Sequence, residues 1–392
     1  KEILGEPIPG SLFLEKSSLY YKKRDSSNSA KNLELALKNY KEDNDLLNIA
    51  ICHNELGLIQ EDDGFFEIGI YHFVRALEIL KDLNDSQKII KTLNNLGNAY
   101  YLIKDLENAY KFYQEALQLS KQENLRLEEI KSASNLVEVL YLLKDYDRIK
   151  RILARNAEFF KENEDVYGII LTDIKNGKLY FIMSKDYDLA YQHLNNALDL
   201  IKKIRNKVSI FVRAKLEWEC FLYLGKLHLI WDNIIDAENS LLQSLEAVRI
   251  FGIRDNINEG EILEELAKIY SIKRDDKRAV EYYNLAYEIY YKFGDNIKCA
   301  DLKYKIAQLY SNSEKKSKAL DYYEEALNLY EDLGHIKEAA ILLHKLGDLY
   351  LNKEMINMAI TNFTRARDYF KELQDDYNAN FLEEKIKSIT ND

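Results

Sequence analysis

The chain contains almost no residue that would interrupt a helix. Of its 392 residues only 2 are proline and 14 are glycine, and both prolines, Pro7 and Pro9, lie close to the start. Beyond Pro9 every residue keeps its backbone donor, so no helix has to end for lack of a hydrogen bond. Sheets and long loops usually contain more Gly and Pro than this. The sequence therefore predicts an all-α protein.

Other shortages narrow the function classes. The 3 cysteines, Cys52, Cys220 and Cys299, have no C-x-x-C spacing and cannot form a disulfide framework, which fits a reducing, cytoplasmic location. A net charge of −11 disfavours direct binding of nucleic acid. No apolar run approaches the roughly 18 residues that a membrane span needs. Because the sequence begins without Met or an apolar leader, we expect that an upstream segment has been trimmed.

A pattern of six places recurs along the chain at intervals of about 40 residues. Small residues at some of these places let two antiparallel helices approach closely, and large residues, mostly tyrosine, fill the space between successive helix pairs. The clearest copy has Leu96, Gly97, Tyr100, Ala109, Tyr113 and Ala116, and the last strong copy has Leu346, Gly347, Tyr350, Ala359, Phe363 and Ala366.

This pattern resembles the tetratricopeptide repeat from about residue 10 to 370. The resemblance implies a right-handed superhelical solenoid of about nine helix-turn-helix repeats, followed by a C-terminal capping helix. The family usually has a period of about 34 residues and a proline that ends the second helix. Here glycine-containing turns at 293–296 and 332–335 replace that proline, and Gly294 and Gly334 fit a left-handed C-terminal cap.

The repeats suggest five segments. We expect an N-terminal leader at 1–9, repeats one to five at 10–200, repeats six to nine at 217–374, and the capping helix at 375–392. Residues 201–216 form an extended inter-repeat region, because Gly177 and Gly225 are 48 residues apart. Longer helices would account for this excess, and a hinge or docking site between two halves is the alternative.

No catalytic, cofactor or metal motif is present. The chain lacks a Gly-rich phosphate loop, an H-E-x-x-H motif and a nucleophile elbow, and its 6 histidines do not recur at ligand spacing. The acidic stretch at 61–64 lacks the alternate oxygen ligands of an EF-hand and is expected to be a turn. Most tyrosines occupy packing places, so we assign them to the core and not to base stacking. We expect a protein that is not an enzyme and has no cofactor.

A polar stripe lies opposite the packing side of the first helix in each early repeat. Lys91, Asn95 and Asn98 share this side when the helix is advanced by about 100° per residue. The next repeat repeats the stripe, and in tetratricopeptide solenoids it lines the concave groove. Asn is unfavourable inside a helix, so its recurrence indicates carboxamides that pair with an extended peptide. The alternative is a solvated face.

The late repeats carry glutamates at equivalent places. Early Lys and Asn against late Glu would orient a bound segment with its acidic part at the early repeats. The predicted peptide-binding residues are Asn54, Lys91, Asn94, Asn95, Asn98, Lys131, Asn135, Glu138, Lys175, Glu261, Glu264 and Glu265.

Two groups of proteins with 40-residue units are similar to this chain. LGN/Pins-type scaffolds share the motif LGNAY, here residues 96–100, and Rap/NprR/PlcR-type peptide receptors place Asn in the groove. The resemblance implies a non-catalytic scaffold that binds a protein or peptide segment in its concave groove. The alternative is the sensor domain of a bacterial peptide-responsive regulator whose effector domain precedes Lys1. We expect neither nucleic acid nor membrane as a partner, and a homodimer is left open.

Overall fold

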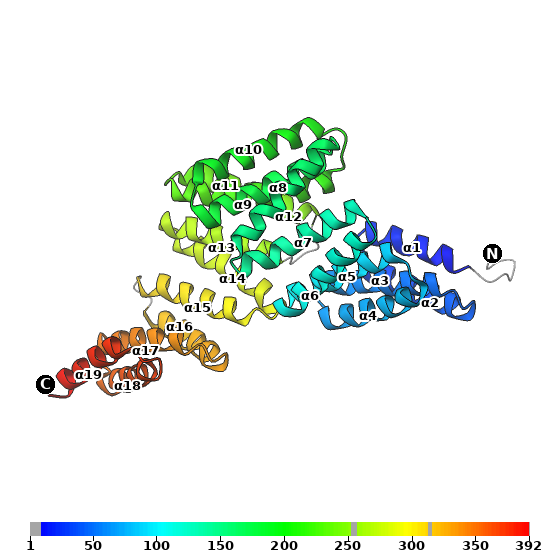
Figure 1. Ribbon diagram of the computed structural model, residues 1–392. Helices are drawn as coiled ribbons and strands as arrows, with labels where there is room; N and C mark the ends of the chain where they lie inside the picture. Colours follow the sequence, from blue (N-terminus) through cyan, green and yellow to red (C-terminus); the bar gives the residue numbers. More distant parts are fainter. Residues whose placement is uncertain (1–8, 252–256, 313–315, 392) are drawn as a thin grey trace. The chain divides into compact units, whose positions relative to one another are not determined.

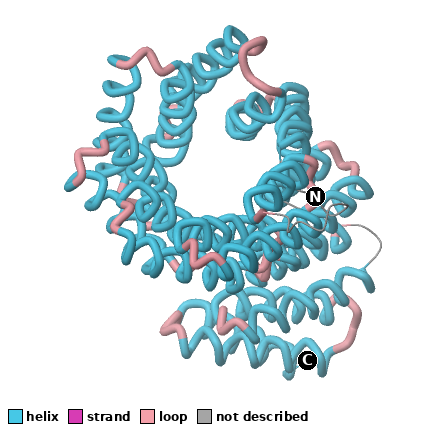
Figure 2. The backbone as a smooth tube through the Cα atoms, turned by 90° about the vertical axis from the view of Figure 1, so that its right-hand side faces the viewer, coloured by secondary structure: helices cyan, strands magenta, loops and turns pink. Residues whose placement is uncertain are grey.

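The computed structural model describes residues 9–251, 257–312 and 316–391. Within these ranges the regular structure consists of 19 α-helices and one short π-helical segment, joined by short connections (Figures 1 and 2). No helix in these ranges is long and apolar enough to cross a membrane. The all-α prediction is confirmed. The chain divides into two compact units, Lys1–Tyr223 and Leu224–Asp392, called unit 1 and unit 2.

Unit 1 contains the first nine helices, the π-helical segment, α10 and the start of α11. Their bounds are α1 (Gly10–Lys22), α2 (Ser26–Glu42), α3 (Leu46–Asp62), α4 (Phe66–Leu83), α5 (Ser86–Leu102), α6 (Leu106–Gln122), α7 (Arg126–Leu142), α8 (Tyr146–Glu162), α9 (Val166–Leu179), η2 (Tyr180–Ser184), α10 (Tyr187–Ile204) and α11 (Ile210–Ile230).

Unit 2 contains the end of α11 and the remaining helices. Their bounds are α12 (Ile234–Phe251), α13 (Ile257–Ile272), α14 (Asp276–Lys292), α15 (Asn296–Ser311), α16 (Lys316–Asp332), α17 (Ile336–Leu351), α18 (Ile356–Glu372) and α19 (Asp376–Asn391). Odd-numbered helices up to α17 are the first helices of the repeats, and even-numbered helices up to α18 are the second helices.

The two helices of a repeat cross where a small residue meets a large ring. A Cβ atom added to Gly97 of α5 would lie 2.5 Å from Cε1 of Tyr113 on α6. Gly57 stands in the same relation to Phe73, again with 2.5 Å to the ring. Because real Cβ contacts are never that short, the ring occupies the space that any larger side chain would need. The predicted repeat register is confirmed.

The period of 40 residues follows from the length of each helix and its turn. α5 and α6 each have 17 residues and are joined by three residues. In this turn Lys104 has a φ of 65°, and the N–H groups of Lys104 and Asp105 donate to the carbonyls of Tyr101 and Tyr100 at 3.1 and 3.0 Å. This is a Schellman-type helix end. Asp105 also begins α6, because its Oδ1 accepts from the N–H of Asn108 at 3.1 Å.

The same turn recurs with few glycines. Gly294 and Gly334 have φ values of 69° and 70°, which confirms the left-handed caps predicted there. Among the described residues, however, 12 non-glycine residues also have positive φ. The turn is therefore stabilised by its hydrogen bonds and its Asp cap more than by glycine.

The region between α9 and α12 departs from the regular spacing. The π-helical η2 extends the end of α9, and α11 has 21 residues, more than any other described helix. α10 ends at Ile204 and α11 begins at Ile210. Longer helical segments thus contribute to the 48-residue interval between Gly177 and Gly225.

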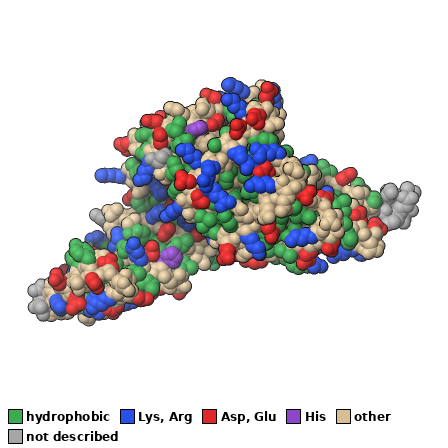
Figure 3. Space-filling model, in the orientation of Figure 1, with side chains coloured by type: hydrophobic (Ala, Val, Ile, Leu, Met, Phe, Trp, Pro, Cys, Tyr) green, Lys and Arg blue, Asp and Glu red, His purple; other side chains and the backbone are tan. Residues whose placement is uncertain are grey.

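The last helix covers the apolar end of the final repeat. Ala379 and Leu382 of α19 are buried in the same core as Leu346 and Phe363. Lys385 of α19 lies 4.7 Å from the ring centre of Phe363. The capping helix is confirmed, and side chains of both charge signs are interspersed over this end of the molecule (Figure 3).

The residues assigned to packing are largely inside. Cys52, Cys220 and Cys299 are free and buried. Of the tyrosines at repeat places, Tyr113, Tyr270, Tyr283, Tyr323 and Tyr350 are buried, whereas Tyr100 and Tyr310 are half-buried and stack on Phe112 and Tyr322.

Replacing Gly97 by Leu should destabilise unit 1. The new side chain would overlap the Tyr113 ring, and overpacking of this kind costs about 1–3 kcal/mol. We expect Gly97→Leu to lower the urea midpoint measured by circular dichroism. Glu115→Leu, which adds the same side chain on the exposed side of α6, is the control. Equal midpoints for the two variants would contradict the helix crossing described here.

Replacing Lys104 by Gly should stabilise unit 1. A left-handed backbone conformation costs a non-glycine residue about 1–2 kcal/mol, and Gly removes this cost. Gly also makes the unfolded chain more flexible, which lowers the gain in stability by about 0.5–1 kcal/mol. We expect Lys104→Gly to raise the free energy of unfolding by up to about 1 kcal/mol. The same substitution inside α6, Gln118→Gly, should lower it by about 1 kcal/mol. A destabilised Lys104→Gly protein would show that the Lys side chain contributes to the turn.

Candidate functional site

The places equivalent to Lys91, Asn95 and Asn98 recur on successive first helices, and within each unit they are here called the first-helix face. Lys91 of α5 has 61% of its side chain exposed and lies 3.8 Å from Glu55 of α3. Lys131 of α7 is 54% exposed and pairs with Glu128 of its own helix at 2.8 Å. Both lysines are accessible to a ligand.

The asparagines of α3 and α5 are bonded to each other. Nδ2 of Asn95 donates to Oδ1 of Asn54 at 3.0 Å, and the hydroxyl of Thr92 donates to the same oxygen at 3.4 Å. Asn54 and Asn95 are only 6% and 9% exposed. These carboxamides connect two consecutive first helices.

The connection continues from α5 to α7. Nδ2 of Asn94 donates to the carbonyl of Ile90 at 3.0 Å and to Oγ of Ser132 at 2.9 Å. Nδ2 of Asn135 donates to Oδ1 of Asn94 at 3.2 Å. We call these bonds, with those of Asn54 and Asn95, the amide ladder. It gives the recurrent Asn a structural reason, because a buried amide without a partner would cost about 1–3 kcal/mol.

Asn98 differs from the ladder. It is half-buried, and its Oδ1 accepts from the hydroxyl of Tyr113 at 2.6 Å. Its Nδ2 has no hydrogen-bond partner among the residues that the structure describes. This amide group can therefore donate to a ligand.

Ionic contacts take the place of the amides further along unit 1. Glu138 of α7 pairs with Lys175 and, at 2.8 Å, with Lys178 of α9, and Glu219 of α11 lies 3.7 and 3.5 Å from the same two lysines. Burial raises the pKa of Glu138, but the charges of Lys175 and Lys178 outweigh it, and the pKa lies well below its usual range. The cluster bonds three first helices together.

The late glutamates are also paired. Glu264 of α13, 4% exposed, lies 3.0 Å from Lys298 and 2.5 Å from Lys305 of α15. Burial raises its pKa, but these two lysines lower it to about 2. Glu261 pairs with Lys226 of α11 at 2.5 Å, and Glu265 pairs with Lys268 at 2.8 Å. These acids present little unbalanced charge to a ligand.

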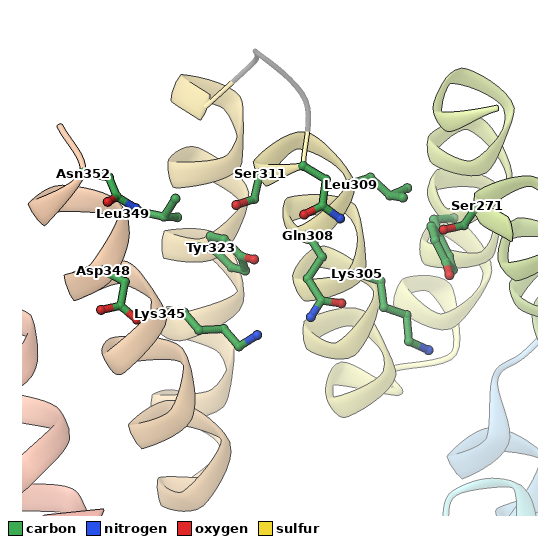
Figure 4. A pocket seen from close by; sticks show the side chains of 12 residues that line it. Ser271, Lys305, Gln308, Leu309, Ser311, Tyr323, Lys345, Asp348, Leu349 and Asn352 are labelled. Carbon is green, nitrogen blue, oxygen red and sulfur yellow. The ribbon is translucent and has the colours of Figure 1, made fainter. Parts of the chain in front are cut away.

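A cleft of about 470 Å³ opens on the first-helix face of unit 2 (Figure 4). Side chains of α15 and α17 line two sides of it, and Tyr323 of α16 lies between them. Lys305 and Lys345 occupy the repeat place of Asn95, and Gln308 and Asp348 that of Asn98. The cleft residues are Ser271, Tyr283, Lys305, Gln308, Leu309, Ser311, Asn312, Tyr323, Lys345, Asp348, Leu349 and Asn352.

Several polar groups in this cleft are not engaged by the protein. The side chains of Gln308, Asn312 and Asn352 have no hydrogen-bond partner within the described ranges 9–251, 257–312 and 316–391. Asp348 pairs with Lys385 at 2.5 Å, and Lys345 lies 5.3 Å from the ring centre of Tyr304. The cleft thus offers free amide groups beside the cationic side chains of Lys305 and Lys345.

The cleft residues differ from the peptide-binding residues predicted from the sequence, although some of them occupy the same repeat places. None of the twelve peptide-binding residues predicted from the sequence lines the cleft. One of them, Glu264, is bonded to the cleft residue Lys305. The signal was the spacing of 40 residues between Lys305 and Lys345 and between Asn312 and Asn352.

The cleft has no arrangement suited to a metal ion. Among the described residues, no group of three or more His, Cys, Asp and Glu side chains could hold one. Burial raises the pKa of Tyr323 to about 12, so its hydroxyl stays protonated at neutral pH. The chemistry on offer is hydrogen bonding, charge and aromatic surface.

Removing the Glu264 charge should flatten the pH dependence of stability in unit 2. Its folded pKa of about 2 lies below the unfolded value near 4.3, so the carboxylate stabilises the fold above about pH 4.3 and loses this effect as the pH falls towards 2. We expect Glu264→Gln to cost about 2–3 kcal/mol at pH 7 and much less at pH 2.5. Glu288→Gln, on the exposed side of α14, is the control. A Glu264→Gln cost that is constant over this range would contradict the pairing, as measured by denaturant titrations at each pH.

The comparisons with known proteins agree with this architecture. Residues 48–122 and 88–162 match the family model of the tetratricopeptide repeat. Residues 232–391 match the model of the soluble NSF attachment protein, SNAP. No curated protein sequence matches the chain.

Three solved structures share the fold over most of this chain. They are the quorum sensor NprR from B. thuringiensis in its apo form (15% identical, 92% of this chain and 98% of that chain, TM-score 0.57), a Rap protein complexed with competence and sporulation factor (12%, 97% and 98%, 0.55), and a signal transduction ATPase with numerous domains from Pyrococcus horikoshii that has a tetratricopeptide repeat sensor (14%, 97% and 52%, 0.53). The chain thus spans about half the length of the last protein. The fold of the chain is a helical solenoid of the tetratricopeptide-repeat type, like that of NprR and the Rap protein.

Proposed function

We propose that this chain is a non-catalytic module that binds an extended peptide segment in the cleft of unit 2. The observation that supports this most is the pair of equivalent polar rows along α15 and α17 and the residues that directly follow them, in which Gln308, Asn312 and Asn352 have free amide groups. Carboxamides both donate and accept, as the peptide backbone does. Free amides at successive repeats therefore suit a chain that runs across the helices.

The size and lining of the cleft suit a short stretch of peptide. Its volume of about 470 Å³ lies within the range of about 300–1,000 Å³ that is common for ligand sites. Tyr283 and Tyr323 supply aromatic surface, and Leu309 and Leu349 supply apolar contacts. Lys345, which has no carboxylate partner among the described residues, favours an acidic side chain in the bound segment.

The predicted residues of unit 1 take a smaller part in the proposal. The amide ladder engages Asn54, Asn94, Asn95 and Asn135, and the ionic cluster engages Glu138 and Lys175. Lys91, Asn98 and Lys131 keep accessible groups. We propose these three as a separate contact surface on unit 1.

The second candidate function is the sensor part of a bacterial peptide-responsive regulator. The fold match to the quorum sensor NprR and to a Rap protein extends over 92% and 97% of this chain, which favours this candidate. It agrees with a peptide ligand and with the cytoplasmic location expected from the cysteines.

Selection from a random peptide library tests the proposed cleft. We expect the full chain to enrich a defined sequence motif, and Gln308→Ala/Asn352→Ala to weaken binding of the selected peptide by about 1–3 kcal/mol, or 0.5–1.5 kcal/mol per lost hydrogen bond. Fluorescence anisotropy of the labelled peptide gives the affinity. Asn328→Ala, on the exposed side of α16, is the matched control.

Two results would overturn the proposal. One is the absence of any enriched motif in repeated selections with folded protein. The other is a selected peptide that binds the double variant and the wild type equally well, which would place its site outside the cleft.

A further inference from the structure

A second pocket lies in unit 1, among α6, α7 and α8. Its volume is about 250 Å³. α6 and α8 are the second helices of two consecutive repeats, so this pocket lies away from the first-helix face and shares no residue with the cleft of unit 2.

Four cationic side chains line the pocket, and no acidic side chain is among its described lining residues. Arg148 donates to the hydroxyl of Tyr110 at 2.6 Å, and Arg155 pairs with Glu129. Arg151 and Lys121 are exposed and have no partner among the residues that the structure describes. The local charge is strongly positive, which favours an oxyanion.

The side-chain oxygen of Asn156, which lines the pocket, is buried and has no hydrogen-bond donor among the described residues. Asn156 is 1% exposed, and its Nδ2 donates to Oγ of Ser134 at 2.9 Å. The single hydroxyl proton of Ser134 goes to the carbonyl of Ile130 at 2.9 Å, so Ser134 can only accept from Asn156 and the amide cannot be turned round. Oδ1 of Asn156 is left without a partner in the described structure.

The pocket also leaves one buried donor unused. Nε of Arg155 has no hydrogen-bond partner among the described residues, although another nitrogen of the same guanidinium pairs with Glu129. A buried donor or acceptor left unpaired is costly, so a ligand that supplies both partners is favoured.

The remaining lining is apolar. Leu117 of α6, Ala133 of α7 and Ile152 of α8 form this part of the pocket. An inorganic oxyanion would not use such a surface, whereas an organic ligand with an aliphatic group would bury it.

We propose that this pocket binds the C-terminal residue of a peptide. Three groups of such a residue match the three features: the α-carboxylate meets the guanidinium groups, the amide N–H donates to Asn156, and an aliphatic side chain packs on Leu117 and Ile152. An internal Asp or Glu has the carboxylate and the N–H but no aliphatic side chain for the apolar part. Sulfate has neither a donor nor an aliphatic part.

Titration with two matched dipeptides tests the proposal on the full chain. The probes are acetyl-Ala-Leu with a free carboxylate and the same dipeptide with a C-terminal amide. Calorimetry and saturation-transfer NMR measure their binding. We expect the free acid to bind roughly tenfold more tightly than the amide, because the amide loses a charge-assisted hydrogen bond.

Charge-matched variants locate the site. Arg151→Gln should weaken binding of the free acid by roughly tenfold without affecting the fold, since Arg151 makes no contact that the described structure needs. Lys150→Gln removes the same charge from the neighbouring residue of α8, which does not line the pocket, and should leave the affinity within about twofold. Added sodium sulfate should compete weakly.

Three outcomes would overturn the proposal. Equal binding of acid and amide would remove the role of the carboxylate. Equal losses in Arg151→Gln and Lys150→Gln would mean non-specific attraction. Inorganic phosphate or sulfate that binds as tightly as the dipeptide acid would show an inorganic anion site in which the apolar lining has no role.

Discussion

The close crossing of two helices within each repeat is the contact on which the rest of the structure depends. At Gly57 and Gly97 the first helix has no side chain, and an aromatic ring of the second helix fills the space. The ring is buried, so the contact removes a large apolar surface from water while it fixes the distance between the helices. With 17-residue helices and three-residue turns, this crossing returns about every 40 residues and places the same faces of successive first helices side by side.

That arrangement explains why the polar first-helix face changes along the chain. In α3, α5 and α7 the helices are close enough for Asn54, Asn94, Asn95 and Asn135 to bond across them, and burial makes these bonds costly to lose. In α7 and α9, ion pairs serve the same purpose. In unit 2 the Glu264 cluster is followed on α15 and α17 by amides that no neighbouring first helix engages. A ligand finds free groups where the contacts between repeats leave them.

The fold could be predicted well from the sequence because its determinants are local and periodic. The near absence of proline leaves the helices uninterrupted. The small residue at the place of Gly97 and the ring at the place of Tyr113 recur in register, so one repeat predicts the next. The left-handed turn at Lys104 could not be predicted in this way, because its hydrogen bonds and the Asp105 cap stabilise a conformation that Lys alone disfavours. The π-helical segment Tyr180–Ser184 likewise has no signal of its own in the repeat pattern.

The sequence alone could not show which polar side chains the fold itself engages. The Asn stripe was a real feature, but its partners are 38 to 41 residues away, and periodicity alone does not distinguish an amide that faces a neighbouring helix from one that faces a ligand. The free amides Gln308 and Asn352 lie at or near the equivalent places of later repeats, where no Asn stripe marks them in the sequence. Contacts between repeats decide which polar groups remain available.

The most direct test of this account is to map where a selected peptide touches the chain. A peptide from the library, carrying a photo-reactive diazirine, would be cross-linked to the full-length chain, and the attachment sites would be read by mass spectrometry. The account predicts attachment to α15 and α17, around Gln308, Lys345 and Asn352. Attachment concentrated on α5 and α7, at Asn95 and Asn135, would contradict it, because the amide ladder would then have to open to receive the peptide.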